Sequence, residues 1–159
     1  MTMSLTFPLS AMQRQVWALL NKGFSHNEVA QQLHTSRQYV HQTRRNAERN
    51  LTKALMDVAE AANLQIKKLQ VNAGILWGYH PSIDCNVVVT FTVKNGIKLW
   101  HWIEEPEAIS DDHYWQETRK YLLNLAEEHS IPLSERQRQL HPVKLANYLF
   151  QELLPGVTP

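Results

Sequence analysis

Residues 24–51 read FSHNEVAQQLHTSRQYVHQTRRNAERNL, and this stretch decides the fold of the first half of the chain. It contains two helix starts in close succession, at Ser25 and Ser36. A serine at a helix start accepts a hydrogen bond from a backbone N–H of the first turn that has no partner inside the helix. Because only two letters separate Leu33, the last apolar residue of the first helix, from Ser36, the turn must be sharp. We expect a short helix after Ser25 and a longer one after Ser36.

A further helix precedes this pair, in the stretch PLSAMQRQV at residues 8–16. Ser10 with Gln13 three residues later forms the pattern of a capping box, in which two side chains satisfy backbone N–H groups reciprocally. A near-copy, PLSERQRQL, stands at residues 132–140, but Pro142 stops helix growth soon after it. Only the first copy continues into two more helices, so the repeat marks helix starts and not a duplicated module.

The third helix is expected to bury one side and to expose a polar, basic one. Its apolar side includes Val40, Ala47 and Leu51, and neither Gly nor Pro interrupts residues 24–73, so the helix can continue toward residue 62. Residues three and four apart share a helix face. The exposed face presents Arg37, Gln38, His41, Gln42, Arg45 and Arg49. Arginine pairs with guanine, and glutamine with adenine, in the major groove of duplex DNA.

The distribution of charge agrees with a polyanionic partner for the first half. Residues 1–69 carry nine Lys/Arg and four Asp/Glu, whereas residues 70–159 carry seven and eleven. No acidic residue lies between Glu28 and Glu48. A basic surface of this kind attracts the phosphate backbone. The sequence therefore predicts a double-stranded DNA partner, with a recognition helix at about residues 36–50 in the major groove.

Residues 9–51 also resemble a known family of helix-turn-helix modules. They are similar to region four of bacterial sigma factors and to LuxR-type regulators. TSRQYV (35–40) followed by RRNAERNLTKA (44–54) is most similar to the archaeal Tfx-type DNA-binding regulators, which join such a module to a separate C-terminal domain. The positions that carry the resemblance are Leu9, Ser10, Gln13, Arg14, Val16, Leu19, Gly23, Ser25, Glu28, Ala30, Leu33, Ser36, Val40, Ala47 and Leu51.

The resemblance implies a tetrahelical helix-turn-helix. Family members meet bases with the residues just after the start of the third helix and one turn later. They meet phosphates through hydroxyls and helix N-termini. The resulting set of expected DNA-binding residues is Ser25, Thr35, Ser36, Arg37, Gln38, His41, Gln42, Arg44, Arg45 and Arg49.

The second half of the chain changes to strand-like sequence. GILWGYH (74–80) and CNVVVTFTV (85–93) are rich in β-branched and aromatic residues. Asn95-Gly96 favours a two-residue hairpin loop with a type I′ turn. Such a loop places on one face the pairs Val93 with Lys98, Phe91 with Trp100 and Val89 with Trp102.

Three helices follow, at about 112–128, after Ser134 and from Pro142. The expected fold class is therefore α+β, with an N-terminal tetrahelical helix-turn-helix domain at residues 5–69. A small α+β domain at residues 70–159, with an antiparallel hairpin or meander packed on helices, is expected to dimerise or to sense an effector. Core packing, an effector pocket and a dimer interface stay open as roles for its aromatic residues: Trp77, Tyr79, Phe91, Trp100, Trp102, Tyr114 and Trp115.

Other classes of function find little support in the sequence. No apolar run approaches the roughly 18 residues that span a bilayer, and the N-terminus lacks the features of a signal peptide, so we expect a cytoplasmic protein without membrane contact. Cys85 is the single cysteine, and with His80, His101 and His113 it shows no metal-ligand spacing. The sequence shows no third group that would orient a base beside a nucleophile. We therefore expect no catalytic residue, no metal and no cofactor.

The function that the sequence predicts is a sequence-specific, double-stranded DNA-binding transcription regulator. One helix of this kind reads few bases, so a homodimer is expected. The transcription machinery and a small-molecule effector are further expected partners. The alternative is a protein-interaction adaptor that docks a region-four-like module on the transcription machinery.

Overall fold

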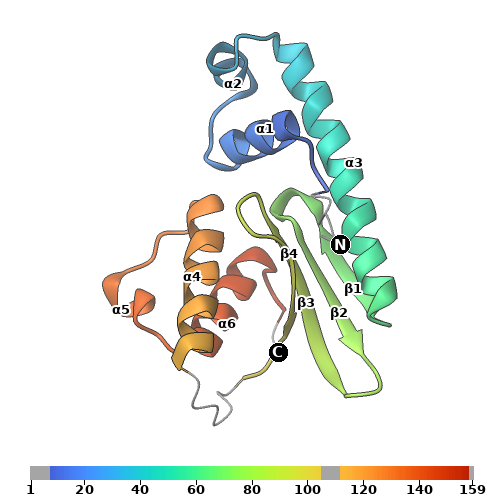
Figure 1. The fold of residues 1–159 in the computed structure, drawn as a ribbon, viewed down its shortest axis with the longest axis vertical. Helices are drawn as coiled ribbons and strands as arrows, with labels where there is room; N and C mark the ends of the chain where they lie inside the picture. Colours follow the sequence, from blue (N-terminus) through green and yellow to red (C-terminus); the bar gives the residue numbers. More distant parts are fainter. Residues whose placement is uncertain (1–7, 105–111, 158–159) are drawn as a thin grey trace, which may run out of the picture.

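The computed structural model describes residues 8–104 and 112–157 of the chain. A four-stranded antiparallel sheet, in the order β1-β2-β3-β4, has helices on both faces (Figure 1). The helices are α1 (Ala11–Asn21), α2 (His26–Gln32), α3 (Arg37–Ala61), α4 (Asp112–Glu128), α5 (Glu135–Arg138) and α6 (Pro142–Leu153). The strands are β1 (Gln65–Gln70), β2 (Ile75–His80), β3 (Cys85–Thr92) and β4 (Gly96–His101), with a 3-10 turn, η1 (Val71–Ala73), between β1 and β2. The expected α+β class is confirmed.

Helices α1, α2 and α3 begin directly after their capping serines. The hydroxyls of Ser10, Ser25 and Ser36 each accept the backbone N–H three residues further on, at 3.2, 3.1 and 3.0 Å. Helix α3 then runs without interruption to the end of its 25 residues. Residues 8–64 therefore hold three helices, where the resemblance implied four.

The connection between α2 and α3 is sharp because a left-handed residue follows α2. His34 has a φ of 53°, and the Thr35 amide donates to the Ala30 carbonyl at 2.9 Å. This closes α2 with a Schellman-type turn. Val16 of α1 and Val40 of α3 are fully buried in a small core shared by the three helices. The direction of α3 is thus fixed by both the turn and the packing.

Strand β1 was not expected from the sequence. Its letters, QIKKLQ, contain a single β-branched residue and two adjacent lysines, which is a weak strand signal. The pairing with β2 also shifts between Ile66 and Lys68. Such a bulge breaks the alternation of inward and outward side chains that would have marked a strand.

The β3–β4 hairpin closes with a three-residue loop, so the predicted register is wrong. Thr92 pairs with Gly96, whereas a two-residue loop would pair Val93 with Lys98. A type I′ turn needs positive φ at both central residues, but of Asn95 and Gly96 only Gly96 has a positive φ, 72°. The backbone N–H of Asn95 instead donates to the Thr92 hydroxyl at 3.0 Å, which stabilises the wider loop.

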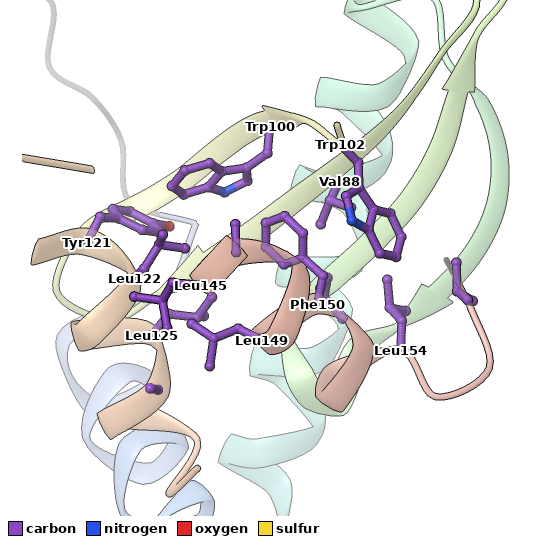
Figure 2. Packing of buried hydrophobic residues seen from close by; sticks show 14 residues of the cluster. Val88, Trp100, Trp102, Tyr121, Leu122, Leu125, Leu145, Leu149, Phe150 and Leu154 are labelled. Atoms are coloured by element: carbon purple, nitrogen blue, oxygen red, sulfur yellow. The ribbon is translucent and has the colours of Figure 1, made fainter. Parts of the chain in front are cut away.

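The same shift moves Trp100 of β4, and Trp102 just after it, to the other face of the sheet. Trp100 pairs with Val88 instead of Phe91. Trp100 and Trp102 pack against Phe150 on the side of α4 and α6 (Figure 2), whereas Phe91 packs on the side of α1 and α3. Side chains alternate along a strand, so a register change of an odd number of residues exchanges the faces. The predicted single aromatic face is therefore wrong.

Both faces of the sheet are covered, and the two large cores lie on opposite sides of it. The core under α4 and α6 contains Ile75, Val88, Trp100, Trp102, Tyr121, Leu122, Leu125, Leu145, Leu149, Phe150 and Leu154 among others (Figure 2). The core between the sheet and the first helices contains Leu9, Trp17, Ala47, Leu51, Leu55, Ala59, Leu76, Val89 and Phe91. The division expected between residues 69 and 70 falls inside β1. Helix α3 thus packs directly on the sheet.

The repeated capping box gives a testable prediction. Ser10 and Ser134 make equivalent hydrogen bonds, but α1 buries Val16 and Trp17 whereas α5 buries no residue. Ser10→Ala is expected to lower the free energy of unfolding by about 1 kcal/mol, because α1 forms part of the global core. Ser134→Ala, the matched control, should speed amide exchange within α5 and leave the urea midpoint nearly unchanged. Equal losses of global stability would contradict this difference.

Candidate nucleic-acid interface

The first half of α3 presents a polar face to solvent. Six of the expected DNA-binding side chains lie there and are all exposed: Arg37, Gln38, His41, Gln42, Arg45 and Arg49. Val40, Thr43 and Ala47 are buried on the other side of the same helix. Figure 1 shows α2 and the start of α3 at one end of the molecule, away from the sheet. The rest of the fold therefore leaves this face open to a large partner.

Three arginines of this face, Arg37, Arg45 and Arg49, form no ion pair within residues 8–104 and 112–157. The nearest acidic residues along α3, Glu48 and Asp57, are each bound by another cation. The positive charge of the three guanidinium groups is therefore not neutralised within the described chain. Exposed cations that lack an internal partner are suited to an external anion.

A hollow lies between the start of α2 and the exposed face of α3. His26, Arg37, Gln38, His41 and Gln42 line it, and the ring centroids of His26 and His41 are 5.8 Å apart. His26 was not among the expected DNA-binding residues. Its position as the first residue of α2, directly after the capping Ser25, is the signal that would have suggested it. The structure thus brings α2 and α3 together at one surface.

The hydroxyl residues expected to meet phosphates differ in their surroundings. The Ser25 hydroxyl caps α2, where the Glu28 carboxylate also accepts the Ser25 N–H at 3.1 Å. Hydrogen bonding from the Ser25 backbone lowers the pKa of Glu28, so a negative charge already sits at this helix start. Helix α3 has no acidic residue in its first turn. Ser36, with the half-buried Thr35 beside it, is therefore the better place for a phosphate.

Arg44 does not lie on the exposed face, so its position gives no support to the expected role in DNA binding. Its side chain is 13% exposed, and Nε donates to Glu48 Oε1 at 2.9 Å. The guanidinium also lies 4.0 Å from the ring centroid of Trp17. Arg44 follows Val40 by four residues and precedes Ala47 by three, so it projects on the same side as these buried residues.

Arg44 instead takes part in a half-buried polar cluster, where the end of α4 meets α1, α3 and the β3–β4 loop. The Glu128 carboxylate accepts the Val93 N–H at 2.8 and 3.1 Å. Burial raises the pKa of Glu128 to about 7, although the Val93 backbone N–H and the Trp17 indole favour the charged form. Burial lowers the pKa of His129 to about 4, and the charge of Arg44 acts in the same direction.

The described residues contain no group placed for metal binding and no activated thiol. No three His, Cys, Asp or Glu residues within 8–104 and 112–157 are placed to hold a metal ion. Burial raises the pKa of the Cys85 thiol, which donates to the Asn86 carbonyl at 3.1 Å. A protonated thiol is a poor nucleophile. No helix in the same residues is long and apolar enough to cross a membrane.

The chain matches no protein-family model, no curated protein and no solved structure. The exposed face of α3 combines arginine, glutamine and histidine side chains, and its positive charge is not neutralised by ion pairs within the described residues.

Proposed function

We propose that the protein is a transcription regulator that binds duplex DNA with the first half of α3 in the major groove. The observation that carries this proposal is the exposed row of arginine, glutamine and histidine side chains on a helix held from behind by α1 and α2. An α-helix fits the major groove, where each base pair shows a distinct pattern of donors and acceptors. In this proposal α2 and α3 are the two helices of a helix-turn-helix, with α1 as their support.

The residues of the face take different roles in the proposed complex. Arg37, Gln38, His41 and Gln42 lie nearest the helix start and are assigned to base edges, because recognition helices of this type read bases with their N-terminal residues. Arg45 lies one turn further along the same face. Arg49, Ser36 and Thr35 are assigned to the phosphate backbone, which positions a protein without reading sequence.

A homodimer is part of the same proposal. One helix in the major groove contacts only a few base pairs, and two copies on two half-sites multiply the specificity. The half-sites are then expected about one helical turn of DNA apart, or a multiple of it. Sedimentation of the purified protein with and without a bound duplex measures whether one copy or two associate with each site.

Arg49→Ala tests the phosphate contact. The variant is expected to weaken all duplexes about equally and to reduce the slope of log affinity against log salt by about 1. Lys53→Ala is the matched control, because Lys53 lies one turn further along α3 and is bound to Asp57 at 2.8 Å. Fluorescence anisotropy over a series of salt concentrations measures both slopes. An unchanged slope for Arg49→Ala, or an equal change for Lys53→Ala, would remove Arg49 from the interface.

A further inference from the structure

A cavity of about 430 Å³ lies between β4, α4 and α6, on the face of the sheet opposite to α3. Trp100 of β4 and Trp102, just after this strand, form one wall, and Trp115 of α4 and Ala146 of α6 form others. Figure 2 shows Trp100 and Trp102 beside Phe150. A cavity of this volume suits a small organic molecule.

The aromatic walls are held in place by their own polar atoms. The indole N–H of Trp100 donates to the Thr90 hydroxyl at 2.9 Å, and that of Trp102 donates to the Asn147 side chain at 2.8 Å. Both rings meet Phe150 edge to face, with centroids 5.9 and 5.7 Å apart. Because both indole N–H groups are already bonded, the parts of these rings that reach the cavity are mainly apolar. A ligand with a planar aromatic body matches such walls.

The cavity also carries positive charge. Lys98 supplies this charge, and none of the lining residues of the cavity in the described chain is acidic. The Lys98 ammonium lies 4.5 Å from the ring centroid of Trp100 and 5.0 Å from that of Tyr121. Burial lowers the pKa of Lys98, while Glu117, exposed on α4, favours its charged form. An anion inside the cavity would stabilise the partly buried ammonium more than an exposed carboxylate does.

We propose that this cavity binds a small organic anion with a planar aromatic body. The rings lie against the indoles of Trp100, Trp102 and Trp115, and the anionic group meets the Lys98 ammonium. The site is separate from the face of α3, and its occupation does not depend on DNA binding.

Two dyes that share an anilinonaphthalene skeleton test the proposal. 8-Anilinonaphthalene-1-sulfonate carries a negative charge, and N-phenyl-1-naphthylamine does not. The sulfonate is expected to bind one per chain, and Lys98→Gln should weaken it about tenfold while changing the neutral dye less than about twofold. Lys67→Gln, an exposed lysine on β1, is the matched control and should change neither dye. Equal effects of Lys98→Gln on both dyes, or none on either, would overturn the role of Lys98.

A measurement on the unaltered protein locates the bound dye. Addition of the sulfonate should shift the indole N–H resonances of Trp100, Trp102 and Trp115 and leave that of Trp17, which is buried on the other side of the sheet, in place. Ala146→Phe, which fills the cavity, should weaken both dyes at least tenfold in a protein that keeps its cooperative unfolding. Shifts at Trp17 as large as those at Trp100, or no shift at Trp100 and Trp102, would overturn the site.

Discussion

The double variant Arg37→Ala/Arg45→Ala is expected to bind its preferred duplex at least about thirtyfold more weakly than the unaltered protein. Each arginine that meets a base edge or a phosphate contributes about 1–3 kcal/mol. Both side chains are exposed and form no ion pair within the described residues, so their removal should leave the unfolding midpoint nearly unchanged. Anisotropy titrations with the preferred and a scrambled duplex measure the loss of affinity and of specificity.

The control for this variant is Arg44→Ala. Arg44 is almost buried against Trp17 and bound to Glu48, so its loss should lower stability and should leave the preference between duplexes unchanged. Affinities are compared at a temperature where both variants are fully folded. If Arg44→Ala relaxed the sequence preference while the double variant retained it, the assignment of the exposed face would be wrong.

The second large effect concerns the half-buried polar cluster around Glu128 and His129. The folded-state pKa of Glu128 is raised from 4.5 to about 7, so its stabilising contribution is full below pH 4.5 and is lost as the pH rises toward 7. The folded-state pKa of His129 is lowered from 6.5 to about 4, so its contribution is full above pH 6.5 and is lost as the pH falls toward 4. Each amounts to about 3 kcal/mol. Between pH 4.5 and 6.5 the loss from Glu128 and the gain from His129 nearly offset each other as the pH rises, so the total stability changes little.

Single variants should reveal separately the two opposed pH dependences of the free energy of unfolding. Relative to Glu128→Gln, the unaltered protein should lose about 3 kcal/mol of unfolding free energy between pH 4.5 and 7. Relative to His129→Gln, it should gain about as much between pH 4 and 6.5. Urea unfolding at a series of pH values measures both differences. Parallel stability curves for the unaltered protein and both variants would contradict the burial of these groups.

Much of the local structure follows from the sequence because it depends on near neighbours. Ser10, Ser25 and Ser134 start helices through bonds to residues three positions away, and Pro142 supplies the first turn of α6. These contacts are the same in any fold that contains such helices, so single stretches of sequence suffice to predict them. The exposed face of α3 follows for the same reason, from helical spacing alone.

The predictions from the sequence that were wrong or missing concern features that depend mainly on residues far apart in the chain. Asn95-Gly96 fits a two-residue loop, but the pairing of the whole of β3 with β4 selects a loop of three residues. The β1 strand forms because it pairs with β2, and its own residue types favour a strand only weakly. Arg44 is an exception, because its spacing from the buried Val40 already turns it inward, as its contact with Trp17 of α1 shows.

The packing of the two halves of the chain against each other could also not be predicted from short stretches of sequence. The resemblance suggested a DNA-binding module joined to a separate domain, yet Leu51 and Leu55 of α3 share a core with Leu76 and Phe91 of the sheet. The half-buried Glu128 bonds the β3–β4 loop from the end of α4. The proposed reading helix is thus part of the same packed structure as the sheet.

Selection of bound duplexes from a random pool by the purified protein is the most direct test of DNA reading by α3. We expect one enriched motif, binding that weakens steeply as salt rises, and loss of enrichment in Arg37→Ala/Arg45→Ala. A pool that stays random, with binding that is independent of salt and unchanged in the double variant, would contradict the proposal. The exposed face of α3 would then be better explained as a docking surface for another protein.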